Sequence, residues 1–228
     1  MTHEIPRRNF LKAAGVGAAA IPFAGLVTPI AGKPMSGPLR VGLVGCGGRG
    51  TGAAMQALAA DKDVILYAMG DLFADRLASS HASLQENFQN RVQVEESRRF
   101  TGFDAYQKVI AEVDVILFAT PPAFRAAHIA AAVEAGLHVF CEKPVAVDAF
   151  GVRSVLETAK LARQKGLSLA SGFCWRAAYG HRALYDRVHS GGIGEVRHVY
   201  ATYLTGGLWY KERQPEWTDL EYQLRNWL

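Results

Sequence analysis

Cysteines, paired metal ligands and long uninterrupted apolar runs are scarce or absent in this sequence of 228 residues. The three cysteines, Cys46, Cys141 and Cys174, form no Cys-x-x-Cys pair and have no His/Cys spacing suited to zinc, so we expect no metal site. Free cysteines usually behave as small apolar residues, and we expect all three to be buried. The composition also excludes a collagen, a coiled coil and a multi-span membrane protein.

The excess of positive charge is small. The net charge is +4, and Arg7, Arg8 and Lys12 against Glu4 account for half of it. No cluster or stripe of Lys and Arg accompanies this balance, so the sequence does not indicate a nucleic-acid partner. Half of the residues are hydrophobic and 20% are charged, which is typical of a globular protein with one or two domains.

The first 38 residues have the features of an export signal followed by a linker. Adjacent Arg7 and Arg8, followed by Asn-Phe-Leu-Lys, resemble the twin-arginine export motif. The apolar stretch behind them is interrupted by Pro22 and Pro29, which makes it a poor permanent membrane helix. We therefore expect export to the periplasm by the twin-arginine machinery. The alternative is retention at the membrane by an uncleaved signal.

From Leu39 onward, short apolar runs alternate with helical patterns. Strands are expected at 39–44, 64–69, 113–119, 137–141 and 167–172, and helices at 50–60, 73–88, 104–112, 123–135 and 149–165, with Gly136 and Gly166 ending the last two. Continuous apolar strands between amphipathic helices predict an α/β fold, in which a parallel sheet is covered on both faces. With right-handed crossovers, residues 39–172 form a doubly wound, Rossmann-type sheet.

The pattern changes after Trp175. A helix is expected over 177–189, and alternating polar and apolar residues predict a half-exposed antiparallel strand over 196–205. We place a domain boundary near Phe173 and expect 173–228 to begin a second α/β domain with a mainly antiparallel sheet. Only about 55 residues follow the boundary and no capping signal closes them, so we expect a C-terminally truncated fragment.

The first predicted strand runs into Gly45-Cys46-Gly47-Gly48-Arg49-Gly50, a G-x-G-x-x-G motif between a strand and a helix. In this context the first glycine permits a tight turn, the second lets the backbone approach a pyrophosphate, and the third allows close helix–strand packing. The alternative is a glycine-rich turn that binds nothing. The placement between strand and helix favours a dinucleotide site.

Asp71 ends the second predicted strand, 21 residues after Gly50, where an acid that binds the adenosine ribose is expected. Its alternative role is to cap the helix that begins near Phe73. A carboxylate here favours NAD over NADP because it repels a 2′-phosphate. Arg76, one turn into the helix, would soften that preference.

Two further motifs follow predicted strands. Thr120-Pro121-Pro122 would stiffen the loop beside the cofactor crevice, or would simply start a helix with a proline in its first turn. Glu142-Lys143-Pro144 places an ammonium group at the same edge of the sheet, where it could orient a hydroxyl group and move its proton. The alternative for Lys143 is a solvated surface residue.

Together, Gly45–Gly50, the Ala-Thr-Pro-Pro turn and above all Glu142-Lys143-Pro144 resemble the Gfo/Idh/MocA family, named for glucose–fructose oxidoreductase, inositol dehydrogenase and rhizopine catabolism. The resemblance covers 39–228. It implies a Rossmann domain followed by a domain with a large open sheet, an NAD or NADP cofactor, and a sugar, polyol or cyclitol substrate. Full-length members are commonly homo-oligomers.

The resemblance also implies roles for individual residues. Lys143 would lie beside the nicotinamide and the substrate as the catalytic residue, while Trp175 and Arg176 would contact the substrate. The cofactor-binding set would comprise Gly45, Cys46, Gly47, Gly48, Arg49, Gly50, Asp71, Thr120, Pro121, Pro122, Glu142 and Lys143. The family's further proton-transfer residues would lie beyond Leu228, and we assign none of that role to His181, His189 or His198.

The leading prediction is therefore NAD-dependent oxidation or reduction of a sugar-like substrate, in which the protein positions the nicotinamide. One alternative is an NAD-dependent glycosidase that oxidises C3 transiently, because a branch of the family resembles such glycosidases. The other is a nucleotide-binding protein without activity.

Overall fold

The computed structural model describes residues 37–227. The predicted export signal, including Arg7 and Arg8, lies outside the described residues. Within 37–227, no helix combines the length and the apolar character needed to cross a membrane.

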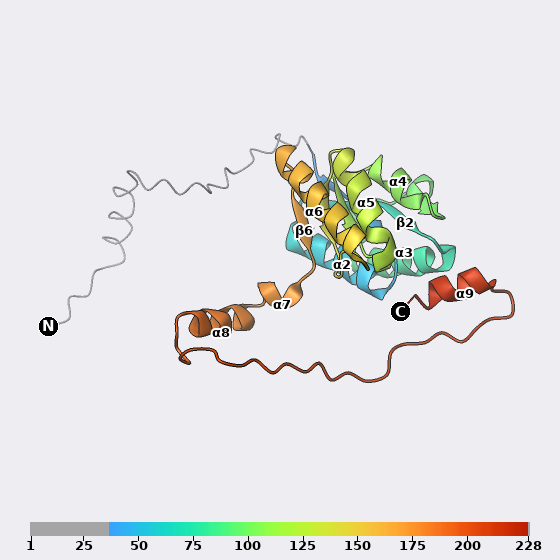
Figure 1. The fold of residues 1–228 in the computed structure, drawn as a ribbon. Coiled ribbons are helices and arrows are strands. Elements are labelled where there is room, and N and C mark those ends of the chain that lie inside the picture. Colours follow the sequence, from blue (N-terminus) through green and yellow to red (C-terminus); the bar gives the residue numbers. More distant parts are fainter. Residues whose placement is uncertain (1–36, 228) are drawn as a thin grey trace. The chain divides into compact units, whose positions relative to one another are not determined.

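Six strands form a single parallel sheet in the order β3-β2-β1-β4-β5-β6 (Figure 1). They are β1 (Leu39–Val44), β2 (Val64–Asp71), β3 (Arg99–Thr101), β4 (Val115–Phe118), β5 (His138–Cys141) and β6 (Leu169–Ser171). This is the strand order of a doubly wound dinucleotide-binding sheet. The chain adds strands toward one side of the sheet from β1 to β3 and toward the other side from β4 to β6, so the order reverses between β1 and β4. The Rossmann-type prediction is confirmed.

Five main helices cover the two faces of this sheet. They are α2 (Gly48–Ala60), α3 (Ala74–Phe88), α4 (Ala105–Ile110), α5 (Pro122–Glu134) and α6 (Ala149–Gln164). In Figure 1, α2 and α3 lie on one face of the sheet and α5 and α6 on the other. One apolar cluster joins α2 and α3 to β1 and β2, and a second joins α4, α5 and α6 to the other face. Both faces of the central strands are therefore buried, which explains their continuous apolar sequences.

The sequence predicted most of these elements to within a few residues. β1 has the predicted bounds, and Gly136 and Gly166 end α5 and α6 with φ values of +86° and +71°. The short strand β3 was not predicted, because its three residues, Arg-Phe-Thr, carry no apolar run. Two 3-10 turns, Gln89–Arg91 and Glu96–Arg98, lead into it.

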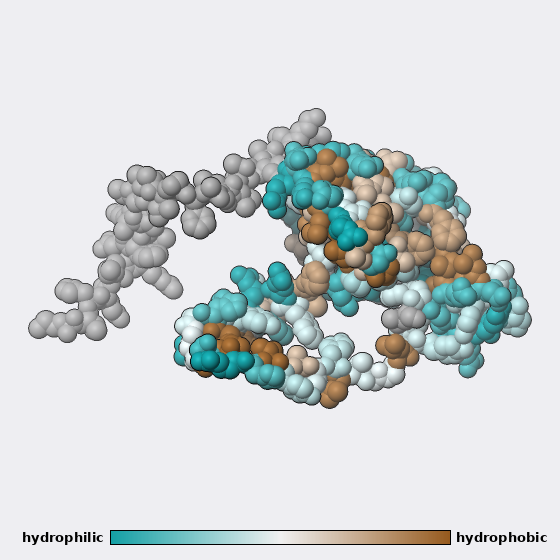
Figure 2. All heavy atoms as spheres, in the orientation of Figure 1, coloured by the Kyte–Doolittle hydropathy of each residue, from teal (hydrophilic) through white to brown (hydrophobic). Residues whose placement is uncertain are grey.

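The prediction for the C-terminal segment was wrong in one respect. No strand forms over 196–205, which is exposed throughout. A strand needs a neighbour for its backbone N–H and C=O groups, and no other strand in the described residues lies beside this segment. Figure 2 shows apolar and hydrophilic side chains mixed along this part of the surface.

Helices also differ from expectation in this segment. The helix predicted at 177–189 is present as α8 (Tyr179–His189), and an unpredicted short helix, α7 (Cys174–Ala177), precedes it, with Ala178 in an extended conformation between them. An unpredicted helix, α9 (Asp219–Arg225), begins after Thr218, whose hydroxyl accepts the backbone N–H of Glu221 at 3.2 Å. The sequence Thr-x-x-Glu is the signal that could have identified it.

The cysteines follow the expectation only in part. Cys46 and Cys141 are buried, but Cys174 is exposed because α7 leaves the sheet after β6. Among residues 37–227, no group of three or more potential ligand side chains could hold a metal ion.

Candidate functional site

The predicted cofactor residues meet at one edge of the sheet. Because the strands are parallel and nearly in register, the loops that follow β1, β2, β4 and β5 emerge side by side. These loops begin at Gly45, Leu72, Ala119 and Glu142, respectively. The arrangement forms a crevice at the carboxyl ends of the strands, beside the point where strand order reverses.

The three motif glycines of the first loop, Gly45, Gly47 and Gly50, differ in how much room the fold leaves for a side chain. Gly45 has φ +95°, and a Cβ there would lie 2.6 Å from the carbonyl carbon of Ala119. A Cβ on Gly50 would lie 1.8 Å from the carbonyl oxygen of Gly45. The fold itself therefore requires both of these glycines.

Gly47 is different, because a Cβ there would meet no atom within 4 Å, and its φ of −74° suits any residue. The neighbouring Gly48 is equally open. Gly47 is the N-cap of α2, and no side chain caps this helix. An open space in front of uncapped backbone N–H groups fits the pyrophosphate of a dinucleotide.

Asp71 holds the glycine loop in place. It is buried, and its carboxylate accepts the backbone N–H groups of Cys46 at 2.6 Å and Phe73 at 2.9 Å. It does not cap α3, whose N-cap is Phe73. Burial, and then the negative charge of Asp71, raises the pKa of the Cys46 thiol well above its usual value, so this cysteine remains a neutral thiol.

An ion pair joins the glycine loop to the Glu142-Lys143-Pro144 loop. The Nε of Arg49 lies 3.1 Å from Oε1 of Glu142, whose side chain is 10% exposed. Gly172, after β6, leaves room for this carboxylate, because a Cβ there would lie 3.0 Å from its Oε2. Lys143 is exposed at the same edge, and its peptide bond to Pro144 is cis.

The Thr120-Pro121-Pro122 turn starts a helix, as one of its two predicted roles requires, while its role in stiffening the loop stays a prediction. Pro121 is the N-cap of α5 and Pro122 is its first residue. Thr120 and Pro121 also line a cavity of about 80 Å³ at the crevice, together with apolar and aromatic side chains. Its other lining residues include Val44, Asp71, Leu72, Phe73, Phe103, Tyr106, Phe124 and His128. Its apolar and aromatic walls lie beside the buried carboxylate of Asp71.

Two buried polar side chains of α5 were missed by the sequence analysis. His128 Nδ1 lies 3.3 Å from the Thr120 hydroxyl, and burial lowers the His128 pKa to about 4, so the ring is neutral at neutral pH. Arg125 donates from Nη1 to the Pro144 carbonyl at 2.5 Å, and burial lowers its pKa. Its Nε has no hydrogen-bond partner among the described residues. Both residues interrupt an otherwise alanine-rich helix, which is the only local signal that they carry.

The two predicted substrate residues, Trp175 and Arg176, lie on α7 and are exposed. The indole of Trp175 stacks on His181, with ring centroids 5.6 Å apart. Within 37–227, neither residue makes a hydrogen bond or ion pair with a crevice residue. The structure therefore does not bring them to the cofactor site.

A second, larger cavity of about 530 Å³ is lined by other residues of the glycine loop. It is bounded by the loop residues Cys46, Gly47 and Gly48, by the facing sides of α2 and α3, and by Lys211. Arg76 and three serines of α3 contribute polar groups to its wall.

Strand order, the open glycine loop and the crevice residues define a dinucleotide-binding Rossmann domain. Residues 39–173 match the family described as "Oxidoreductase family, NAD-binding Rossmann fold" (GFO_IDH_MocA). The chain belongs to this family, and residues 39–173 are therefore an NAD-binding Rossmann domain.

Relatives with curated functions agree with this assignment. The chain is 31% identical over 163 residues to D-glucoside 3-dehydrogenase of Escherichia coli K12, covering 71% of this chain and 42% of that protein. It is 27% identical over 232 residues to a glycosyl hydrolase family 109 protein of Solibacter usitatus, covering 96% of this chain and 51% of the relative. The chain thus spans about half the length of these relatives.

A solved structure shows the same fold. The chain superimposes on myo-inositol 2-dehydrogenase from Lactobacillus plantarum with a TM-score of 0.56 and 26% identity, covering 70% of this chain and 43% of that one. A 3-ketoreductase from Actinomadura kijaniata, in complex with TDP-benzene and NADP, aligns with a TM-score of 0.53 and 28% identity, covering 70% of this chain and 46% of that one.

Proposed function

We propose that this protein is an NAD-dependent oxidoreductase that acts on a hydroxyl or carbonyl group of a sugar, polyol or cyclitol. The observation that carries the proposal is the open space at Gly47, which faces an uncapped helix and shares its edge of the sheet with Lys143. The named activities of the relatives, on a D-glucoside and on inositols, support the substrate class.

Each crevice residue has a role in this proposal. Backbone N–H groups at Gly47 and Gly48 bind the pyrophosphate, and Asp71 accepts a ribose hydroxyl. Thr120, Pro121 and Pro122 shape the wall of the crevice. The nicotinamide supplies hydride acceptance and return when it is bound.

Lys143 is the proposed catalytic residue. Its ammonium group orients the reacting hydroxyl and exchanges a proton with that oxygen, while Glu142 and Arg49 hold the loop beside the cofactor. Trp175 and Arg176 are proposed substrate contacts. They lie on the short exposed helix α7, which begins three residues after the end of β6.

The test of this role is Lys143→Ala, assayed for NADH formation over a panel of hexoses and inositols. We expect turnover to fall by about a hundredfold or more, while the Kd for NAD stays within about twofold. Lys62→Ala, at an exposed turn on the opposite edge of the sheet, is the control. Unchanged turnover in Lys143→Ala would overturn the assignment.

A second function is favoured by a specific observation. The glycosyl hydrolase family 109 relatives match 88–96% of this chain, including the segment after the Rossmann domain, whereas D-glucoside 3-dehydrogenase matches 71%. Under this alternative, C3 of a glycoside would be oxidised transiently by hydride transfer to bound NAD. Loss of the C2 proton would then expel the aglycone from C1, water would add to the resulting double bond, and the hydride would return to C3. Release of free sugar without net NADH formation would identify it.

We further propose that the protein is exported by the twin-arginine machinery to the periplasm, or held at the membrane by an uncleaved signal. The adjacent Arg7 and Arg8 support this proposal. A homo-oligomeric state is proposed from the resemblance to the family alone.

A further inference from the structure

The segment Trp209–Trp227 returns to the Rossmann domain and contacts the start of α3. Arg225 of α9 is the main contact, and it is 8% exposed. It donates to both carboxylate oxygens of Asp75 at 3.0 and 3.1 Å, and its guanidinium lies over the ring of Phe73 with a distance of 4.0 Å to the centroid. Bidentate pairing and stacking together fix α9 against α3.

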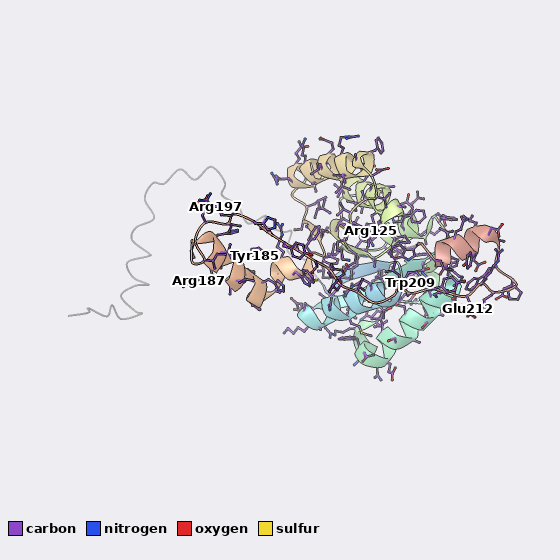
Figure 3. All side chains as sticks on the ribbon, turned by 60° about the horizontal axis from the view of Figure 1, so that its bottom comes forward. Arg125, Tyr185, Arg187, Arg197, Trp209 and Glu212 are labelled. Carbon is purple, nitrogen blue, oxygen red and sulfur yellow. The ribbon has the colours of Figure 1, made fainter. Side chains whose placement is uncertain are left out.

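This contact also fixes Lys211. Asn226, next to Arg225, accepts the backbone N–H of Lys211 at 2.9 Å and donates to its carbonyl at 3.2 Å. Figure 3 shows Trp209 and Glu212, on either side of this stretch, in the part of the chain that runs back to α9. The position of Lys211 is therefore set through α9 by residues of α3.

Lys211 lines the larger cavity, as do Gly47 and Gly48. Arg76 also lines this cavity, with hydroxyl residues from the following turns of α3 and from α2. These hydroxyl residues are Thr51, Ser79, Ser80 and Ser83. The hydroxyls of Thr51 and Ser80 are hydrogen-bonded to each other at 2.7 Å, and Thr51 also donates to the Gly47 carbonyl at 3.0 Å. Ser79 and Ser83 therefore supply the remaining hydroxyl donors. The carboxylate of Asp75 also lines the cavity but is paired with Arg225. Two cations, these hydroxyls and the amide edge of a glycine loop suit a phosphate group.

The local charge balance supports an anionic ligand. Arg225 pairs with both nearby carboxylates, Asp75 and Glu221. Within residues 37–227, neither Lys211 nor Arg76 makes a salt bridge. Burial, and then the positive charges of Arg76 and Arg225, lowers the pKa of Lys211. A bound anion would relieve this repulsion.

We infer that Lys211 binds a phosphate group of the dinucleotide cofactor, and that Arg225 and Asn226 are its positioning residues. The inference rests on the NAD-binding function described above, and it assigns part of the cofactor site to the segment after the Rossmann domain. The phosphate can be the pyrophosphate common to NAD and NADP, or the 2′-phosphate that only NADP carries.

The test is calorimetric titration of NAD and of NADP into the wild-type chain and Lys211→Gln. Lys62→Gln makes the same chemical change at an exposed turn at the far end of α2, and it serves as the matched control. We expect Lys211→Gln to weaken binding by about threefold to tenfold, because the ammonium group is partly screened by solvent. An equal loss for both cofactors identifies the pyrophosphate, and a loss for NADP alone identifies the 2′-phosphate.

A second measurement does not depend on affinity differences. Acetic anhydride labels exposed lysines, and mass spectrometry follows each one. We expect bound cofactor to protect Lys211 but not Lys62 from acetylation, and we expect Asn226→Ala to lose most of this protection even at a cofactor concentration that saturates the variant. That combination is not expected of a merely structural role.

The inference is overturned if Lys211→Gln binds both cofactors as tightly as the wild type and the cofactor does not protect Lys211. The NAD-binding function would stand in that case. Absence of NAD binding by the wild-type chain would overturn the function itself, and the inference with it.

Discussion

The guanidinium of Arg49 and the carboxylate of Glu142 lie 3.1 Å apart and connect two loops that are far apart in sequence. Arg49 belongs to the loop that faces the open space at Gly47, and Glu142 directly precedes Lys143. The pair thus couples the proposed pyrophosphate-binding backbone to the proposed catalytic ammonium group. Its partners differ in exposure, at 49% for the Arg49 side chain and 10% for that of Glu142.

This geometry predicts a modest stability change in Glu142→Gln. Because Arg49 is half exposed, solvent screens the pair, and we expect the free energy of unfolding to fall by about 1 kcal/mol. Urea unfolding measures this value. Glu157→Gln, which breaks an ion pair with Lys160 at 2.7 Å in which both side chains are exposed, is the control and should change stability by less than about 0.5 kcal/mol. Equal effects of the two substitutions would contradict the role of the Arg49–Glu142 pair.

Because Asp71 carries a carboxylate, we predict that the protein binds NAD more tightly than NADP. At about 4 Å and an effective dielectric near 20, a 2′-phosphate charge and the carboxylate repel each other by about 4 kcal/mol before screening. Even a third of this value corresponds to about a tenfold difference in affinity. Asp71→Asn keeps the shape of the side chain and one acceptor oxygen but removes the negative charge. Calorimetry should therefore show a smaller difference between the affinities for NAD and NADP. Tighter binding of NADP than NAD to the wild type would refute the prediction.

His128 predicts that part of the stability depends on pH. Its pKa falls from about 6.5 in the unfolded chain to about 4 in the fold, because burial disfavours the charged ring. Between these values the unfolded state binds more protons, so this contribution is present above pH 6.5 and is lost as the pH falls toward 4. The total contribution is about 3 kcal/mol, and about 2 kcal/mol of it is lost by pH 5.

Urea unfolding of the wild type and His128→Gln at pH 7.5 and pH 5 tests this prediction. Carboxylates titrate in both proteins, so the informative quantity is the difference between them. We expect the wild type to lose more stability than the variant on acidification. An identical loss in the two proteins would show that the His128 pKa is not lowered in the fold.

The export proposal predicts the behaviour of Arg7→Lys/Arg8→Lys. The double substitution keeps both positive charges but removes the guanidinium groups, and we expect the protein to accumulate in the cytoplasm. Cell fractionation with immunoblotting measures the distribution. Arg153→Lys, on the exposed side of α6, is the control. A periplasmic signal equal to that of the wild type would exclude the twin-arginine pathway.

The elements that the sequence predicted correctly are those with local causes. The apolar run in 39–44, followed by a glycine turn, is typical of a buried strand, and Gly136 and Gly166 mark helix ends through their own backbone freedom. The crevice residues were predicted as a group because parallel strands bring their carboxyl ends to one edge.

The features that were missed have causes that lie elsewhere in the chain. Whether 196–205 forms a strand depends on a partner strand, and the alternating pattern does not reveal that partner. His128 and Arg125 are buried by contacts with Thr120 and with the Pro144 carbonyl, which no helical pattern encodes. The contact between Arg225 and Asp75 joins residues 150 positions apart and could not be read from either segment.

Calorimetric titration of NAD into wild type, Gly47→Ala and Gly180→Ala tests most directly whether the open glycine loop is a dinucleotide site. A Cβ meets no protein atom within 4 Å at either glycine, so both variants should melt close to the wild-type temperature. We predict that Gly47→Ala loses at least about tenfold in NAD affinity, because its methyl group occupies the space in front of the α2 N–H groups, and that Gly180→Ala binds as the wild type does. Equal affinity of Gly47→Ala and the wild type, or no NAD binding by the wild type, would contradict the account.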